Sequence, residues 1–403
     1  MINLDIPKKL RPIVAQAHMV AENVFRPISR KYDTAEHAYP EELDMLAALM
    51  DGINDSGKGT GASAGGLSQS SKSDEKGIRN GSNMATVLGM IELCWGDTGL
   101  ALSIPRQGLG NAAIAAVATP EQKERFGKVW AAMAITEPGA GSDSAAVRTT
   151  AELDGDEWVL NGEKIFVTAG QRANAVVVWA SLDLAAGRAA IKSFVVPKGT
   201  PGMEMVRLDK KLGIRASDTA TLLFTNCRIP KDNILGSADF DTKKSFAGVM
   251  KTFDNTRPVV AAMAIGVARA SLERTKEILA KAGVHTHYEG NLRDISAAEA
   301  ELYRLEAELE SARLLTIKAA WMADNRIPNS MEASMSKAKA GRVANELTLR
   351  CVELCGALGY GETELLEKWA RDSKILDIFE GTQQIQMLII ARRLLGKTSA
   401  DLR

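Results

Sequence analysis

A glutamate near the end of the chain has surroundings that suit proton transfer. Glu380 follows the apolar pair Ile378-Phe379 and precedes Gly381, so its carboxylate is expected on a tight corner bordered by apolar surface. Removing a carboxylate from water disfavours its charged form, and the raised pKa makes it a better proton acceptor. Glutamates at helix starts are more often placed there by the helix dipole, and this residue alone leaves that alternative open.

A second segment has the composition of a ligand-binding loop. Residues 133–143 read MAITEPGAGSD, in which a proline and two glycines hold the backbone open between hydroxyl side chains. Such a loop can present N–H donors to a flat ligand. A glycine-rich linker between two structural units has a similar composition, so the segment becomes informative only together with others.

A third segment, residues 253–258, reads FDNTRP and combines a helix-start pattern with a fixed charge. Asn255 or Thr256 is expected to cap a helix that has Pro258 in its first turn. Of the residues in this segment, Arg257 is the one that a capping role explains least. The permanent charge of Arg257 suits an anionic ligand.

Three successive regions are expected to position these residues. We predict an α+β multidomain chain with an N-terminal helical domain (1–130), a middle antiparallel β domain (131–238) and a C-terminal four-helix-type bundle (239–403). Short β-branched and aromatic runs between turn residues indicate the strands. Asp154-Gly155 and Asn161-Gly162 are both typical of two-residue hairpins.

The helical regions have their own markers. Thr119 is expected to cap a helix with Pro120 at its first position. Apolar spacing predicts helices at about 296–323, 335–355 and 384–395, which together indicate a bundle. The segment from Asp51 to Asn83 is rich in Gly and Ser and is predicted to be a long loop.

Composition excludes several classes of function. The 403 residues include 50 Lys plus Arg and 50 Asp plus Glu, so the chain lacks the basic field that nucleic-acid or anionic-membrane binding requires. No window is apolar enough to span a membrane, and a cytoplasmic protein is expected. Four scattered cysteines predict no disulfide framework, and no metal site is expected.

Four motifs in this order resemble the acyl-CoA dehydrogenase family. The resemblance runs from about Ala131 to Leu395, with a looser match before it. The motifs are TEPGAGSD at 136–143, NGEKIFVT at 161–168, FDNTRP at 253–258 and IFEGTQQIQ at 378–386.

The resemblance implies an FAD enzyme that converts an acyl-CoA thioester to its trans-2-enoyl-CoA and passes electrons to an electron-transferring flavoprotein. Glu380 is then the base that removes the α-proton. The implied FAD-binding residues are Met133, Ile135, Thr136, Ser142, Phe166, Thr168, Thr382 and Gln384. The implied substrate-binding residues are Ser142, Phe253, Asp254, Arg257 and Gly381.

One of these positions departs from the family in residue type. Phe166 stands where the family usually has Trp, which keeps an apolar face but loses an indole N–H donor. Without its neighbouring motifs, Phe166 would be interpreted as an ordinary aromatic of a sheet core.

The chain also departs from the family on the surface that usually contacts a neighbouring subunit. Residues 282–290 read AGVHTHYEG and lack the usual Arg, and Glu353 stands where Gln is usual. An acidic Glu353 would repel a pyrophosphate. These departures suggest an α2β2 heterotetramer with a related chain, while a homotetramer stays nearly as plausible. An acyl-CoA oxidase and a partner subunit without independent activity are the alternative functions.

Overall fold

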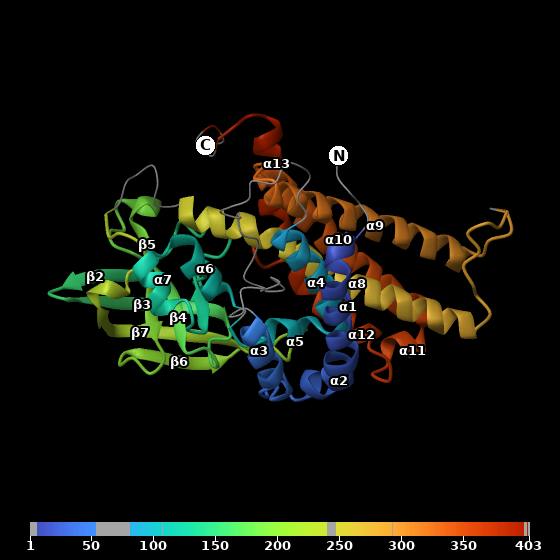
Figure 1. Ribbon diagram of the computed structural model, residues 1–403, viewed down its shortest axis with the longest axis horizontal. Helices are drawn as coiled ribbons and strands as arrows, with labels where there is room; N and C mark the ends of the chain where they lie inside the picture. The colour runs from blue at the N-terminus through green and yellow to red at the C-terminus, as the bar shows by residue number, and fades with distance from the viewer. Residues whose placement is uncertain are drawn as a thin grey trace.

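The computed structural model describes residues 6–53, 81–106, 108–239, 247–291, 293–398 and 401, with the side chains of 49–53 and 247–255 excepted. Helices precede and follow a sheet in the sequence, and the sheet lies beside the long helices (Figure 1). The loop predicted at 51–83 falls mostly on residues 54–80, which lie outside the described residues. Division into domains at 130 and 238 stays a prediction.

The N-terminal elements are short helices. One start predicted from the sequence is confirmed, because Thr119 Oγ1 accepts a hydrogen bond from the Gln122 amide at 3.3 Å and Gln122 Oε1 accepts from the Thr119 amide at 3.1 Å. This reciprocal pair satisfies amides that a helix start leaves open. The elements are η1 (Lys8–Leu10), α1 (Arg11–Val20), a π-helical turn η2 (Ala21–Phe25), α2 (Arg26–Thr34), α3 (Glu42–Ile53), α4 (Ser82–Gly96), α5 (Thr98–Ser103), α6 (Leu109–Val117) and α7 (Pro120–Phe126).

Within the described residues, seven strands form one sheet in the order β1-β4-β2-β3-β7-β6, with β5 paired to β4. The strands are β1 (Ala131–Ala134), β2 (Thr150–Asp154), β3 (Glu157–Thr168), β4 (Ala175–Ser181), β5 (Ile191–Pro197), β6 (Met203–Leu208) and β7 (Thr219–Pro230). The prediction of an antiparallel sheet was wrong in part, because β1 pairs with β4 in parallel. Hairpin signals report only on strands joined by short turns, whereas β1 and β4 are joined by a long connection.

One of the two predicted hairpins is confirmed. Asp154 pairs with Glu157 at the turn between β2 and β3. The second prediction was wrong, because Asn161-Gly162 lies inside β3, where the pairing with β7 shifts register as in a β-bulge. Gly162 has φ +150°, and a Cβ there would lie 2.4 Å from Thr149 Oγ1. The glycine therefore allows Thr149 to approach β3 closely, and it does not form a turn.

In its described residues, the C-terminal region consists of three long helices, three shorter helices and two short 3₁₀ helices. Its elements are η5 (Lys231–Asn233), α8 (Ala247–Lys281), α9 (Ala297–Asp324), α10 (Ser330–Cys355), α11 (Ala357–Tyr360), α12 (Leu366–Ser373), η6 (Lys374–Asp377) and α13 (Gln383–Leu394). Three of these match the helices predicted from apolar spacing. The predicted cap at Asn255 or Thr256 was wrong, because α8 starts at Ala247 and contains Pro258 in its interior. The preference of proline for a first turn was outweighed by the packing of this helix through the bundle.

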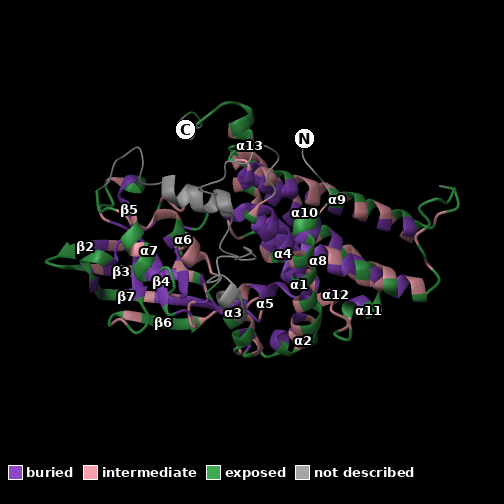
Figure 2. Ribbon diagram, in the orientation of Figure 1, coloured by how far each residue is buried: buried purple, intermediate pink, exposed green. Residues whose placement is uncertain are grey.

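The helices before and after the sheet share a hydrophobic core. Helix α10 packs on α8, α9, α12 and α13, and α4 packs on α8 and α9. Buried residues concentrate where α4 and α8 meet, and a separate core lies within the sheet (Figure 2). Helices α6 and α7 contribute Ala113, Ile114 and Phe126 to a third cluster against β1, β4 and β5. No described helix is long and apolar enough to cross a membrane.

Candidate active site

The turn between η6 and α13 holds Glu380 in a conformation that few non-glycine residues adopt. Glu380 has φ +56° and Gly381 has φ +91°. A Cβ on Gly381 would lie 2.5 Å from Gln386 Nε2, which donates to the carbonyls of Glu380 and Gly381 at 3.1 and 3.0 Å. Left-handed backbone of this kind is costly and is often found at functional sites.

Three groups from two helices act on the Glu380 carboxylate. Thr256 of α8 donates its hydroxyl to Glu380 Oε2 at 2.7 Å. Burial raises the pKa of Glu380, and the Thr256 hydrogen bond and the charges of Arg257 and Lys337 oppose the rise. The direction of this shift, predicted from the apolar neighbours, is confirmed.

Lys337 of α10 contacts the same turn and was not singled out from the sequence. Its ammonium is buried and donates to the Gly381 carbonyl at 2.7 Å. Burial lowers the pKa of Lys337 to about 8, although the charges of Asp377 and Glu380 raise it. A sequence signal existed, because Lys337 lies at helical spacing among the small buried residues Ala333, Gly341 and Ala344.

The loop at 133–143 is fixed to the sheet by a buried ion pair. Lys164 of β3 donates to Glu137 Oε1 at 2.7 Å and to the Ile135 carbonyl at 3.1 Å, and the next amide, of Ile165, donates to the Thr136 carbonyl at 2.9 Å. The side chains of Lys164 and Glu137 are 0% and 6% exposed. Sequence reasoning missed this pair, which lies inside two of the quoted motifs.

The Glu137 carboxylate has further donors that keep it ionised. It accepts the backbone N–H groups of Arg148 and Thr149 at 2.6 and 2.9 Å. Burial would raise the pKa of Glu137, but the Lys164 charge and these hydrogen bonds hold it below its usual value. Burial lowers the pKa of Lys164 to about 8. The ion pair and these hydrogen bonds attach the loop to β3 and to the segment at 148–149.

Phe166 is an exposed aromatic on the sheet, adjacent to this loop through the Ile165–Thr136 hydrogen bond. Its side chain is 62% exposed, and its φ is +57°. The alternative of an ordinary sheet-core aromatic is therefore excluded. Thr168, two residues further along β3, is half-buried.

The remaining candidate residues occupy varied positions. Met133, Ile135 and Thr136 are partly buried at the end of β1, and Ser142 is exposed. Thr382 caps α13 by accepting from the Ile385 amide at 3.4 Å, and Gln384 is exposed. Arg257 is 3% exposed, and its charge acts on the Glu380 carboxylate. The backbones of Phe253 and Asp254 lie in α8, and their side chains lie outside the described residues.

The candidate residues thus form two groups. Thr256, Arg257 and Lys337 surround the Glu380–Gly381 turn, and the loop at 133–143 lies with Phe166 and Thr168 on the sheet. Among the described residues, no set of three or more His, Cys, Asp or Glu could hold a metal ion.

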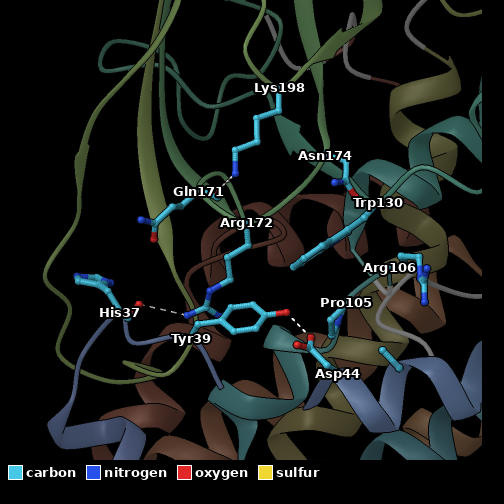
Figure 3. Close-up of a pocket in the computed structure, with 11 residues that line it drawn as sticks. His37, Tyr39, Asp44, Pro105, Arg106, Trp130, Gln171, Arg172, Asn174 and Lys198 are labelled. Atoms are coloured by element: carbon cyan, nitrogen blue, oxygen red, sulfur yellow. Dashed lines mark hydrogen bonds between the residues drawn. The ribbon is translucent and has the colours of Figure 1, made fainter. Parts of the chain in front are cut away.

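A cavity of about 750 Å³ lies elsewhere, between the sheet region and the segments at 37–47 and 105–106 (Figure 3). Three of its polar side chains bind protein groups: Arg172 donates to the Ala38 carbonyl at 2.8 Å, Lys198 donates to the Gln171 carbonyl at 2.7 Å, and Tyr39 donates to Asp44. None of the candidate site residues lines it. The cavity is therefore part of a junction between sheet and helices and does not belong to the candidate site.

Comparison with known proteins agrees with the fold and the motifs. The family model "Acyl-CoA dehydrogenase, middle domain" matches residues 132–227, and "Acyl-CoA dehydrogenase, C-terminal domain" matches residues 246–395. The mitochondrial short-chain specific acyl-CoA dehydrogenase of Bos taurus is 38% identical over 74% of this chain and 72% of its own length.

Two solved structures are similar over nearly the whole chain. Butyryl-CoA dehydrogenase from Megasphaera elsdenii has a TM-score of 0.83 and 28% identity, covering 98% of this chain and 100% of its own. A chain from a structural study of the electron transferring flavoprotein of Acidaminococcus fermentans and flavin-based electron bifurcation has the same TM-score, 29% identity and the same coverage.

Fold and motifs together define a flavoprotein oxidoreductase. The chain belongs to the acyl-CoA dehydrogenase family.

The residues present suit FAD, the cofactor that this family implies. Gly139 and Gly141 have no atom within 4 Å of an added Cβ, so the loop between Thr136 and Ser142 is open on that side. Phe166 offers an exposed aromatic surface beside it. An open loop with backbone amides next to an aromatic face can hold a planar, polar-edged ring.

Proposed function

We propose that this chain is an FAD-dependent acyl-CoA dehydrogenase that oxidises an acyl-CoA thioester to trans-2-enoyl-CoA. The observation that carries the proposal is the Glu380 turn, where a partly buried carboxylate with a raised pKa accepts a hydrogen bond from Thr256. A carboxylate in such surroundings is a stronger base than one in water.

Glu380 removes the α-proton of the thioester, and the C–H electron pair shifts to form the Cα–Cβ double bond as the β-hydride leaves. FAD, when bound, supplies the acceptor for that hydride. Because Glu380 must be ionised before the reaction, the positive charges of Arg257 and Lys337 favour the reactive state. Activity is expected to fall as the pH falls through the raised pKa of Glu380.

The residues proposed to hold FAD are Met133, Ile135, Thr136, Ser142, Phe166, Thr168, Thr382 and Gln384. The firm attachment of residues 135–137 to β3 supports this assignment, because a rigid loop loses little conformational entropy when it binds a ligand. The exposed Phe166 supports it as well.

The residues proposed to bind acyl-CoA are Ser142, Phe253, Asp254, Arg257 and Gly381. Arg257 is buried beside Glu380, so its proposed contact with the substrate is combined with an electrostatic effect on the base. Similarity to the short-chain enzyme of Bos taurus and to butyryl-CoA dehydrogenase supports a short acyl chain.

An electron-transferring flavoprotein is the proposed electron acceptor, and similarity to a chain from the Acidaminococcus fermentans structure supports it. We further propose that the chain assembles with a related chain as an α2β2 heterotetramer. No Arg occurs in residues 282–290, where the His287 amide donates to Glu299 at 2.8 Å, and the exposed Glu353 pairs with Arg350 of its own helix. Residues 282–290 and Glu353 therefore supply no Arg or Lys side chain to an FAD pyrophosphate.

The function is tested by mixing the purified, FAD-loaded protein with butyryl-, octanoyl- and palmitoyl-CoA under anaerobic conditions. The expected result is bleaching of the flavin absorbance, fastest with butyryl-CoA, with one trans-2-enoyl-CoA formed per flavin reduced. Reoxidation by an electron-transferring flavoprotein that greatly exceeds reoxidation by oxygen would exclude an acyl-CoA oxidase. A flavin that no acyl-CoA reduces would contradict the proposal.

A further inference from the structure

Helix α10 packs closely against one side of the turn that carries Glu380. Gly341 allows this close approach, since a Cβ there would lie 2.9 Å from the Leu376 carbonyl oxygen. One helical turn before it, Lys337 donates to the Gly381 carbonyl at 2.7 Å, and Gln383 donates to the Ala338 carbonyl at 3.2 Å. The backbone of α10 and one of its side chains therefore hold both ends of the turn that carries Glu380.

A buried lysine is an unusual donor to a backbone carbonyl such as that of Gly381. A fully buried ammonium is costly, and an uncharged donor would bind the carbonyl with less desolvation. The charged groups that face it are Asp377 and Glu380 of the turn and Arg257 of α8. Its charge therefore acts on the same carboxylate that the neighbouring Thr256 contacts directly.

We propose that Lys337 is the positioning residue of the base, and that its buried ammonium both holds the Glu380–Gly381 turn and keeps Glu380 ionised near neutral pH. The inference rests on the proposed role of Glu380 as the base. It assigns Lys337 no contact with substrate or cofactor. A nearby positive charge favours a carboxylate over a carboxylic acid, so its removal must raise the pKa of Glu380.

Two variants remove the Lys337 charge, one without and one with an N–H donor in its place. Lys337→Met removes both the charge and the hydrogen bond to Gly381, whereas Lys337→Gln keeps an N–H donor without the charge. Lys339→Met is the matched control, because Lys339 lies on the same helix and pairs with Glu308. If Lys337→Met does not fold, Lys337→Gln alone carries the test.

The measurement is the pH dependence of flavin reduction by acyl-CoA, together with infrared titration of the Glu380 carboxyl band. The band is identified by its loss in Glu380→Gln. In both Lys337 variants, the pH at which the rate falls on the acid side and the pH of the carboxyl titration are expected to rise by about one unit. At pH values below the pKa of Glu380, the rate should then be about tenfold lower than in the parent. Lys339→Met should leave both unchanged.

A rate that falls equally at every pH, with the carboxyl titration unmoved, would overturn the inference and leave Lys337 a structural residue. The infrared titration does not depend on catalysis, so it tests Lys337 separately from the base. If Glu380→Gln reduces the flavin at the parental rate, the proposed function fails instead.

Discussion

Replacement of Lys164 by Met tests whether the buried ion pair stabilises the loop at 133–143, which is proposed to bind FAD. The substitution keeps an unbranched apolar side chain of similar length. It removes the 2.7 Å bond to Glu137 and the 3.1 Å bond to the Ile135 carbonyl. Glu137, 6% exposed, would then keep its charge without the Lys164 ammonium.

The expected loss of stability follows from these contacts. Removing one partner of a buried pair costs about 3–5 kcal/mol. Because the Arg148 and Thr149 amides still donate to Glu137, we expect a loss near the lower end of that range, about 3 kcal/mol. The carbonyls of Ile135 and Thr136 should become more mobile, and FAD affinity should fall at least about tenfold, since 1.4 kcal/mol corresponds to that factor.

Urea unfolding followed by circular dichroism gives the stability, and flavin fluorescence on dilution gives the FAD affinity. Glu137→Gln and the double variant complete a cycle, in which a coupling of about 2 kcal/mol or more is expected for groups in direct contact. Lys192→Met is the control, because Lys192 is half-buried on β5 and binds only a carbonyl among the described contacts. Loss of less than about 1 kcal/mol in Lys164→Met, with parental FAD affinity, would refute the reasoning.

Two further predictions concern a buried ion cluster and the assembly. Lys368 binds Asp97 at 2.7 Å and Asp372 at 2.5 Å in a fully buried cluster, in which Asp372 also accepts the Ile214 amide. Lys368→Met should therefore destabilise the chain by about 3–5 kcal/mol, and a thermal unfolding midpoint equal to the parent's would contradict this. The chain expressed alone should lose FAD on gel filtration, and co-expression with its partner chain should give two FAD per four chains by mass action; a stable homotetramer with one tightly bound FAD per subunit would refute the heterotetramer alone.

Much of the fold could be predicted because local signals agreed with tertiary structure. The apolar stripe containing Leu302, Leu305 and Leu309 is buried along α9, and the Thr119 cap forms as expected. Asn161-Gly162 shows the limit of such signals. The pair is compatible with a turn, but β3 continues through it and pairs with β7 on both sides of the register shift.

The candidate site could be predicted only in part from the sequence. Glu380 and the direction of its pKa shift could be predicted from its motif, although Ile378 is exposed and the groups that act on the carboxylate lie on α8 and α10. Thr256 was interpreted as a helix cap, although its hydroxyl contacts Glu380, 124 positions away in the sequence. Lys337 and the Glu137–Lys164 pair depend on contacts between distant segments, which a local pattern does not specify.

Rapid-mixing measurement of flavin reduction in Glu380→Gln tests most directly whether the Glu380 carboxylate removes the α-proton. The amide keeps the shape of the side chain but cannot accept the proton. We predict that this variant binds FAD and acyl-CoA with near-parental affinity and reduces flavin at least about 10²–10⁴-fold more slowly, the usual contribution of a general base. Flavin reduction at the parental rate would contradict the claim.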